Sequence, residues 1–410
     1  MATTKASVHG QDHVQSAVLG LLGTRGPMSR ADLARTLQIS PARLTAVAKE
    51  LLERGMVTEL DTTPSTGGRP GRLLGLTSAN SCAIGAKVTA DHVTTVIVNL
   101  DGTVAASDSH PFDATSATAQ TDLAAILAAT VEVADAVVLG IGVGIPGAVD
   151  SQASGVVTAP FIGWGEAAVG ATLRAALNLP VLVENDVDAL TATELLFGPV
   201  ADHADALVVT IGRGIGAGVV VDGAVHRGSH GAAGEIGHIP IDPDGMPCSC
   251  GSVGCLETIV GDAALIRAAR AVGLLADDTV ATTDDLLALA DAGDPAAQEV
   301  YAHAGRVLAR ALAGVVHTID PEIVVLHGEG VIAWHHWKVG FEPAFRRSLM
   351  ASRRGVPFHV MPWSDVAWAQ GAASLVLGSP FDVAGATGDQ GRLVRERLSD
   401  TSAGREPRSA

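Results

Sequence analysis

Three of the four cysteines in this chain lie close together, a short distance after a histidine. They are Cys248, Cys250 and Cys255, and the histidine is His238. Three thiolates and one imidazole make the soft donor set that tetrahedral Zn²⁺ prefers. The first two cysteines are too close for the usual C-x-x-C element, so zinc-finger spacing does not apply, and buried structural thiols are the alternative explanation. We predict a structural zinc site at these four residues.

Two acidic residues stand beside this cluster in the sequence. Glu235 precedes the histidine within Gly-Glu-Ile-Gly-His, and Glu257 follows the last cysteine within Gly-Cys-Leu-Glu. A metal clip would hold both carboxylates in fixed positions. Because carboxylates accept hydrogen bonds from hydroxyl groups, rigid acceptors of this kind suit a polyhydroxylated ligand.

The same segment resembles the signature of a known family. AAGEIGH at 232–238, followed by CSCGSVGCLE at 248–257, is similar to the signature of the ROK family, which contains sugar kinases and sugar-responsive transcriptional regulators. The resemblance implies an α/β fold of the two-lobed actin-like ATPase (ribonuclease H-like) type, with the ligand in the cleft between the lobes. It also implies that the sugar hydroxyls are held by Asn185, Asp186, Glu235, His238 and Glu257.

Asn185 and Asp186 also stand out by their position in the sequence. They follow the apolar run at 181–183, which we expect to be a strand, and a helix is expected directly after them. Polar residues between a strand end and a helix start are where α/β proteins place ligand contacts. An ordinary helix N-cap is the alternative role for Asp186. The resemblance favours the ligand role and makes Asp186 the equivalent of a kinase's general base.

A phosphoryl-transfer enzyme also needs a phosphate cradle and an acid to hold Mg²⁺. ROK kinases carry Asp-x-Gly-Gly-Thr in the first strand turn. This chain departs from that pattern, because Lys87 stands where the acid is expected and Thr89-Ala90 replaces the glycine pair. A lysine cannot coordinate Mg²⁺. The second glycine turn, at 212–218, is retained. We therefore predict that the sugar site is kept, that the ATP site is lost and that the chain has no catalytic residue.

The first 78 residues have the pattern of a winged helix-turn-helix. Helical spacing covers 14–22, a second helix starts at Ser29, and Ser40-Pro41 is a strong start signal for a third. Two short strands at 56–60 and 73–76 would form the wing. The residues expected to contact DNA are Arg43, Thr45 and Lys49 on the third helix and Arg69 and Arg72 on the wing. A three-helix interaction module with solvated charges is the alternative.

Charge is distributed unevenly along the 410 residues. The formal net charge is −17, yet the residues up to Asn80 are slightly basic, so only the downstream part is acidic. That asymmetry is expected when one part alone meets phosphates. No apolar run reaches the length of a membrane span, and we expect a cytoplasmic protein without a disulfide framework.

We predict a DNA-binding domain at 1–78, a ROK effector domain at 79–380 with lobes at about 79–195 and 196–380, and a disordered tail at 381–410. The leading hypothesis is a transcriptional regulator, a repressor of carbohydrate genes. It would bind a double-stranded DNA operator as a homodimer or homotetramer and respond to a sugar, a sugar derivative or a protein effector. The alternatives are an ATP-dependent hexose or N-acetylhexosamine kinase and a zinc-stabilised scaffold with a vestigial sugar site.

Overall fold

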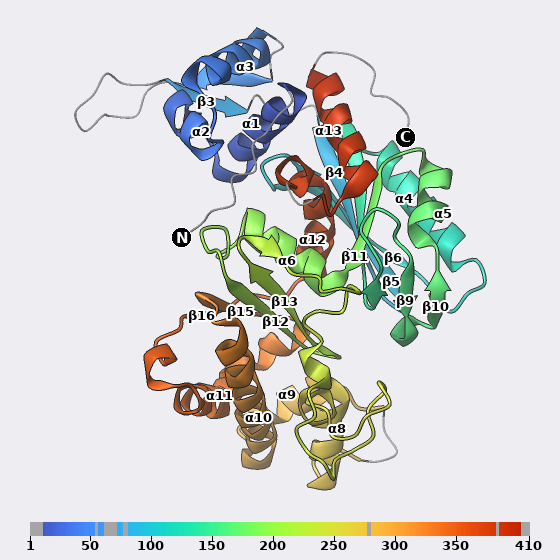
Figure 1. The fold of residues 1–410 in the computed structure, drawn as a ribbon. Coiled ribbons are helices and arrows are strands. Elements are labelled where there is room, and N and C mark those ends of the chain that lie inside the picture. The colour runs from blue at the N-terminus through green and yellow to red at the C-terminus, as the bar shows by residue number, and fades with distance from the viewer. Residues whose placement is uncertain are drawn as a thin grey trace. The chain divides into compact units, whose positions relative to one another are not determined.

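The computed structural model describes residues 11–53, 56–60, 72–76, 81–276, 280–382 and 385–402. The chain forms two compact units (Figure 1). Unit 1 runs to Gly198 and resumes at Asp365, and unit 2 is Pro199–Ser364. In the parts of the chain just given, no helix is long and apolar enough to cross a membrane.

The N-terminal region has the predicted winged helix-turn-helix elements. Its helices are α1 (Gln11–Arg25), α2 (Arg30–Thr36) and α3 (Pro41–Glu53). Its strands are β1 (Met28–Ser29), β2 (Val57–Leu60) and β3 (Leu73–Leu76), paired in the order β1-β3-β2. Ser29 caps α2, because its side chain accepts a hydrogen bond from the Asp32 amide. The wing turn, which includes Arg69, lies outside the described residues.

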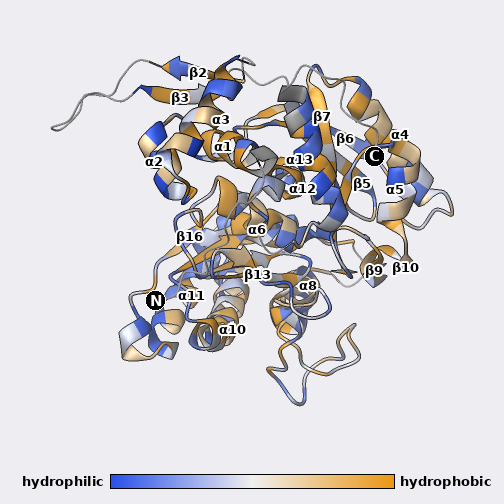
Figure 2. Ribbon diagram, turned by 45° about the horizontal axis from the view of Figure 1, so that its top comes forward, coloured by the Kyte–Doolittle hydropathy of each residue, from blue (hydrophilic) through white to orange (hydrophobic). Residues whose placement is uncertain are grey.

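The main sheet of unit 1 has five strands in the order β11-β7-β4-β5-β6. The strands are β4 (Ser81–Val88), β5 (His92–Asn99), β6 (Val104–Pro111), β7 (Val137–Ile145) and β11 (Val181–Asn185). β4, β5 and β6 pair antiparallel, whereas β7 is parallel to both β4 and β11. β7 is almost entirely hydrophobic (Figure 2), as expected for a strand covered on both faces.

Helices cover both faces of this sheet. One face packs with α4 (Ala119–Glu132) and α5 (Val169–Leu177), and the other packs with α6 (Asp186–Leu196), α12 (Asp365–Gly378) and α13 (Gly388–Ser402). Neighbouring residues of a strand point to opposite faces, so Ile84 joins the first core and Ala83 joins the second. A small sheet adds β8 (Ala148–Val149), β9 (Val157–Ala159) and β10 (Trp164–Ala167), and the turn η1 (Pro160–Ile162) lies between its last two strands.

Two glycines allow α12 to lie directly against the sheet. A Cβ atom on Gly85 of β4 would lie 2.0 Å from the carbonyl oxygen of Ala369, and one on Gly142 of β7 would lie 1.7 Å from that of Ala372. Such short contacts with the helix backbone cannot be relieved by moving a side chain. The close packing of α12 on β4 and β7 therefore depends on both glycines.

Unit 2 has its own five-stranded sheet, in the order β14-β13-β12-β15-β16. Its strands are β12 (Ala206–Ile211), β13 (Ile215–Val221), β14 (Ala224–Val225), β15 (Ile323–His327) and β16 (Phe358–Val360). Its helices are α7 (Glu257–Val260), α8 (Asp262–Ala271), α9 (Thr283–Asp291), α10 (Pro295–Ile319) and α11 (Trp334–Ser348). Short 3₁₀ turns are η2 (Ile236–His238), η3 (Glu329–Ala333) and η4 (Ala351–Arg353).

The two large sheets repeat one topology. In each, three consecutive strands pair antiparallel, a later strand pairs parallel with the first of these, and a further strand pairs parallel with that one. The antiparallel strand pairs that end just before Asp101-Gly102 and Asp222-Gly223 occupy the same place in this topology.

Two details of the C-terminal part differ from the sequence predictions. The second lobe was expected to reach residue 380, but α12 packs on the sheet of unit 1. The segment from 381 was expected to be disordered because of its polar composition. After the short turn η5 (Ser379–Phe381), it instead contains α13, which buries Val394 and Leu398. Two apolar residues four apart are enough to anchor one face of a polar helix.

We predict that Gly142→Ala lowers the stability of unit 1, because the added methyl group would meet the backbone of α12. Overpacking of this kind costs about 1–3 kcal/mol, so the melting temperature should fall by several degrees in calorimetry. Gly165→Ala is the matched control, because a Cβ atom there meets nothing within 4 Å. An equal effect of both changes would contradict the assigned packing.

Candidate functional site

The predicted zinc ligands come together in unit 2. The donor atoms of His238, Cys248, Cys250 and Cys255 all lie within 4.8 Å of one another. His238 Nδ1 lies 3.4 Å from Cys248 Sγ, and Cys250 Sγ lies 3.7 Å from Cys255 Sγ. Zinc–ligand bond lengths give tetrahedral edges of about 3.6 Å for nitrogen to sulfur and about 3.8 Å for sulfur to sulfur. The donor set and its spacing therefore fit a tetrahedral Zn²⁺.

Backbone contacts of the loop after η2 hold these ligands in place. Isolated β-bridges join Pro240 to Cys255 and Pro247 to Val253. Gly254 has a φ of +64°, and a Cβ atom there would lie 1.6 Å from the carbonyl oxygen of Asp242. Only glycine tolerates both conditions. The loop thus brings the four ligands together through its own backbone.

Glu235 and Glu257 lie beside the cluster. Glu235 Oε2 is 3.8 Å from His238 Nε2, so the two ring nitrogens of His238 face different partners. Glu257 Oε2 accepts a hydrogen bond from the Ile215 amide at 3.3 Å. Burial raises the pKa of Glu235, and so does the charge of Glu257, while His238 lowers it. Two carboxylates and an imidazole edge are thus grouped next to the sulfur cluster.

Asn185 and Asp186 lie together in unit 1, at the junction of β11 and α6. The helix cap is Asn185, whose Oδ1 accepts from the amides of Val187 and Asp188. Its Nδ2 donates to the carbonyl oxygen of Gly147 at 3.0 Å. The capping role considered for Asp186 therefore belongs to Asn185, because Asp186 is already the first residue of the helix.

Lys87, near the end of β4, makes an ion pair beside the turn where a kinase would hold phosphate. Its Nζ lies 2.7 Å from Asp365 Oδ1 and 4.5 Å from the centre of the Trp368 ring. Only a tenth of the Lys87 side chain is exposed. The ammonium is therefore engaged by α12 of its own unit.

The neighbouring turn residues bind one another. Thr89 Oγ1 donates to Asp91 Oδ1 at 3.0 Å, and His92 Nδ1 lies 2.9 Å from the same oxygen. His92 Nε2 lies 3.5 Å from Asp365 Oδ2. The polar groups of this turn are thus satisfied within the unit. Asp365 and His92 were not singled out in the sequence. Asp365 could not be linked to this turn by a local pattern, because it lies far along the chain.

The second glycine turn, in unit 2, also holds a protein carboxylate. Glu329 Oε1 accepts the Arg213 amide at 3.1 Å, and a Cβ atom on Gly212 would lie 2.4 Å from the Glu329 carboxyl carbon. Asp262 is close by: burial, followed by the charge of Glu329, raises its pKa to about 6, while Arg213 lowers it. Two carboxylates, those of Glu329 and Asp262, therefore lie beside this turn together with the charge of Arg213.

The predicted DNA-contacting residues of α3 lie on its outer face. Thr45 and Lys49 are exposed and Arg43 is half-buried, while Leu44, Val47, Ala48 and Leu51 point into the core. Thr45 Oγ1 donates to the Pro41 carbonyl at 2.8 Å. Just before β3, Arg72 pairs with Glu59 of β2. The third helix therefore has the two faces that the sequence predicted.

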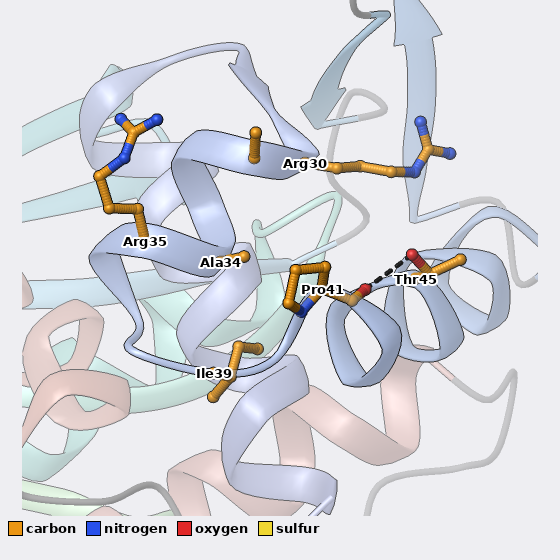
Figure 3. Close-up of a pocket in the computed structure, with 7 residues that line it drawn as sticks. Arg30, Ala34, Arg35, Ile39, Pro41 and Thr45 are labelled. Carbon is orange, nitrogen blue, oxygen red and sulfur yellow. Dashed lines mark hydrogen bonds between the residues drawn. The ribbon is translucent and has the colours of Figure 1, made fainter.

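A hollow of about 480 Å³ lies between α2 and α3 (Figure 3). Arg30 and Arg35 of α2 line it together with Ile39, Pro41 and Thr45. Arg30 also lies 2.7 Å from Glu59, and Arg35 lies 2.7 Å from Asp32. These two arginines were not among the predicted DNA contacts, although the position of Arg30 directly after the capping Ser29 was a usable signal.

Family models match most of the chain. The ROK family model matches residues 83–379, and a MarR family model matches residues 9–69. The DNA-binding transcriptional dual regulator NagC of Escherichia coli is 32% identical over 332 residues, covering 77% of this chain and 80% of NagC. The xylose repressor of Bacillus subtilis is 25% identical over 375 residues, covering 90% of this chain and 96% of the repressor.

Solved structures of both kinds of ROK protein are similar to this one. A ROK family transcriptional regulator described as a homolog of the E. coli MLC protein has a TM-score of 0.75 and 28% identity, covering 93% of this chain and 99% of its own. A ROK family glucokinase from Streptomyces griseus, in complex with glucose and AMPPNP, has a TM-score of 0.62 and 27% identity, covering 72% and 98%. The chain therefore belongs to the ROK family, with a two-lobed sugar-kinase-like fold preceded by a winged helix-turn-helix region.

Proposed function

We propose that this protein is a DNA-binding transcriptional regulator of carbohydrate genes, most simply a repressor, whose ROK domain binds a sugar or sugar derivative and does not phosphorylate it. The observation that carries the proposal is the helix-turn-helix joined to a ROK domain whose first phosphate-binding turn is altered and whose second is contacted by a carboxylate of the protein. NagC and the xylose repressor, which match over most of this chain, support the same reading. A regulator of this kind would act in the cytoplasm, where it meets its DNA operator.

DNA binding is assigned to the outer face of α3, with Arg43, Thr45 and Lys49 in the major groove. The wing residues Arg69 and Arg72 would contact phosphates or a narrow minor groove. Arg30 and Arg35, which line the hollow in Figure 3, are further candidates for contacts with the DNA phosphate backbone at the edge of this face. Contacts of that kind fix the position of the protein on DNA, while the residues of α3 read the sequence.

Loss of kinase activity is supported by two separate features. In unit 1 the place of the Mg²⁺-binding acid is taken by Lys87, which pairs with Asp365. In unit 2 the glycine turn offers its Arg213 amide to the Glu329 carboxylate. The first feature removes a ligand of Mg²⁺. The second puts the carboxylate of Glu329 where a phosphate would bind. Either change alone weakens binding of a nucleotide phosphate, which depends on cations and free amides.

The sugar is assigned to Asn185, Asp186, Glu235, His238 and Glu257. Each of these side chains can exchange hydrogen bonds with hydroxyl groups. Because the side chain of Asn185 already caps α6 and binds Gly147, we assign its role mainly to positioning Asp186. Zn²⁺ bound by His238, Cys248, Cys250 and Cys255 would act as a structural clip that fixes the residues beside it.

The response to the effector requires two states of the protein with different affinities for the sugar. We propose a homodimer or homotetramer on a pseudo-palindromic operator, in which sugar binding changes the spacing of the paired helix-turn-helix regions. A coupling free energy of roughly 1–3 kcal/mol is typical of such regulators. A protein effector in place of the sugar would use the same coupling.

Arg43→Ala and Lys49→Ala should each weaken binding to an operator selected from genomic fragments with the wild-type protein. The expected loss is about 1–3 kcal/mol for a base contact, and the salt dependence should decrease for a phosphate contact. Fluorescence anisotropy at several salt concentrations measures both effects. Lys338→Ala, which removes an exposed positive charge in unit 2, is the control. If neither α3 variant differs from this control, the assignment of the recognition helix is wrong.

Cys255→Ser should release the tightly bound zinc and lower the melting temperature, because metal binding free energy contributes to folding. Zinc retained after dialysis is measured by mass spectrometry, and stability by calorimetry. Ser249→Ala changes an exposed neighbour between two ligands and should leave both readouts as in the wild type. Equal zinc content in the two variants would show that the cluster is not the zinc site.

The wild-type protein should release no ADP above background when incubated with Mg-ATP and a panel of hexoses and N-acetylhexosamines. A thermal-shift screen on the same panel should show a stabilising sugar, because a ligand that binds only the folded state raises the melting temperature. Mg-ATP should add nothing to that shift. Sustained ADP release with any sugar would favour the kinase alternative, and no stabilising sugar would favour a protein effector.

A further inference from the structure

A second group of metal-binding side chains lies in unit 2, apart from the cysteine cluster. Asp291 is the last residue of α9, and His335 and His336 are in the first turn of α11. One carboxylate oxygen and two imidazole nitrogens lie within 4.8 Å of one another. Asp291 Oδ1 is 2.7 Å from His335 Nε2 and 2.8 Å from His336 Nε2. Three potential ligands thus converge on one point from two helices.

We propose that Asp291, His335 and His336 form a second metal site, which takes a borderline divalent transition ion such as Zn²⁺ or Ni²⁺. Imidazole nitrogens and a carboxylate are suited to such ions, whereas Mg²⁺ and Ca²⁺ prefer oxygen ligands alone. The set contains no thiolate, so this site differs in chemistry from the cysteine cluster.

The ring of His336 is held in position by its neighbours. It stacks on Tyr301 of α10 at 5.8 Å with an interplanar angle of 20°, and only 11% of its side chain is exposed. The Tyr301 hydroxyl donates to the Thr283 carbonyl at the start of α9. Such support around a ligand reduces the entropy lost when a metal binds.

The other two ligands are more open. About half of the His335 and Asp291 side chains is exposed, which leaves an approach from solvent and room for water as a further ligand. The present distances are those of two N–H···O hydrogen bonds. Metal bonds of about 2.1 Å place neighbouring ligand atoms about 3.0 Å apart in octahedral and about 3.4 Å apart in tetrahedral geometry. The two histidine–aspartate distances need to lengthen by about 0.2–0.7 Å, which the exposed pair allows.

A metal at this point would join the end of α9 to the start of α11. These helices are separated in sequence by all of α10 and β15, so the ion would link two distant parts of unit 2. The site would therefore act as a cross-link that forms only when the ion is present.

The test uses the full-length protein with zinc already bound at the cysteine cluster. Ni²⁺ is then titrated by isothermal calorimetry in a chelator-free buffer at neutral pH. The wild type should take up one Ni²⁺ per chain, and that uptake should raise the melting temperature. His335→Ala and Asp291→Asn should each weaken this binding by roughly ten-fold or more, since a direct ligand contributes at least as much as an outer-shell partner.

His303→Ala is the matched control, because His303 is another exposed histidine in a helix of unit 2. It should bind Ni²⁺ as the wild type does. Circular dichroism of each variant without Ni²⁺ checks that the fold is retained. Co²⁺ gives a second readout: at this site it should add only weak visible bands, without the thiolate charge-transfer band of the cysteine cluster. The proposal is overturned if the wild type takes up no Ni²⁺, or if all three variants bind it equally.

Discussion

The packing of α12 on the glycine-lined face of the first sheet is the constraint on which much of unit 1 depends. Gly85 and Gly142 let the helix approach so closely that its backbone touches the strands. That position brings Asp365, at the start of α12, to within 2.7 Å of Lys87 on β4. Beside the turn that would hold a phosphate in a kinase, Lys87 is therefore paired with an aspartate that α12 supplies.

The two sheets share a topology, and the equivalent turn of each contains a different charged contact. In unit 1 a cation replaces the acid, and it is neutralised by an aspartate from a distant helix. In unit 2 the glycines remain, but Glu329 accepts the backbone amide that a phosphate would need. The two sheets thus keep the same topology, while the turns that follow β4 and β12 contain different charged contacts.

Local patterns predicted most elements and the cysteine cluster, because their residues are close in sequence. The Ser40-Pro41 start signal placed α3 correctly. Strand β6 was missed because its exposed, polar sequence resembles a loop, and α13 was missed because only one face is apolar. The partners of Lys87 and Arg213 lie 278 and 116 residues away, so no local pattern could identify Asp365 or Glu329.

The two ends of the described chain share one hydrophobic core. Val14 and Val18 of α1 belong to the same buried cluster as Val394 and Leu398 of α13, and the two helices are in contact. A helix-turn-helix region whose core includes residues of α13 is not a structurally independent module. Exchange of DNA-binding regions between relatives by recombination would therefore succeed only when the C-terminal helix is exchanged with them.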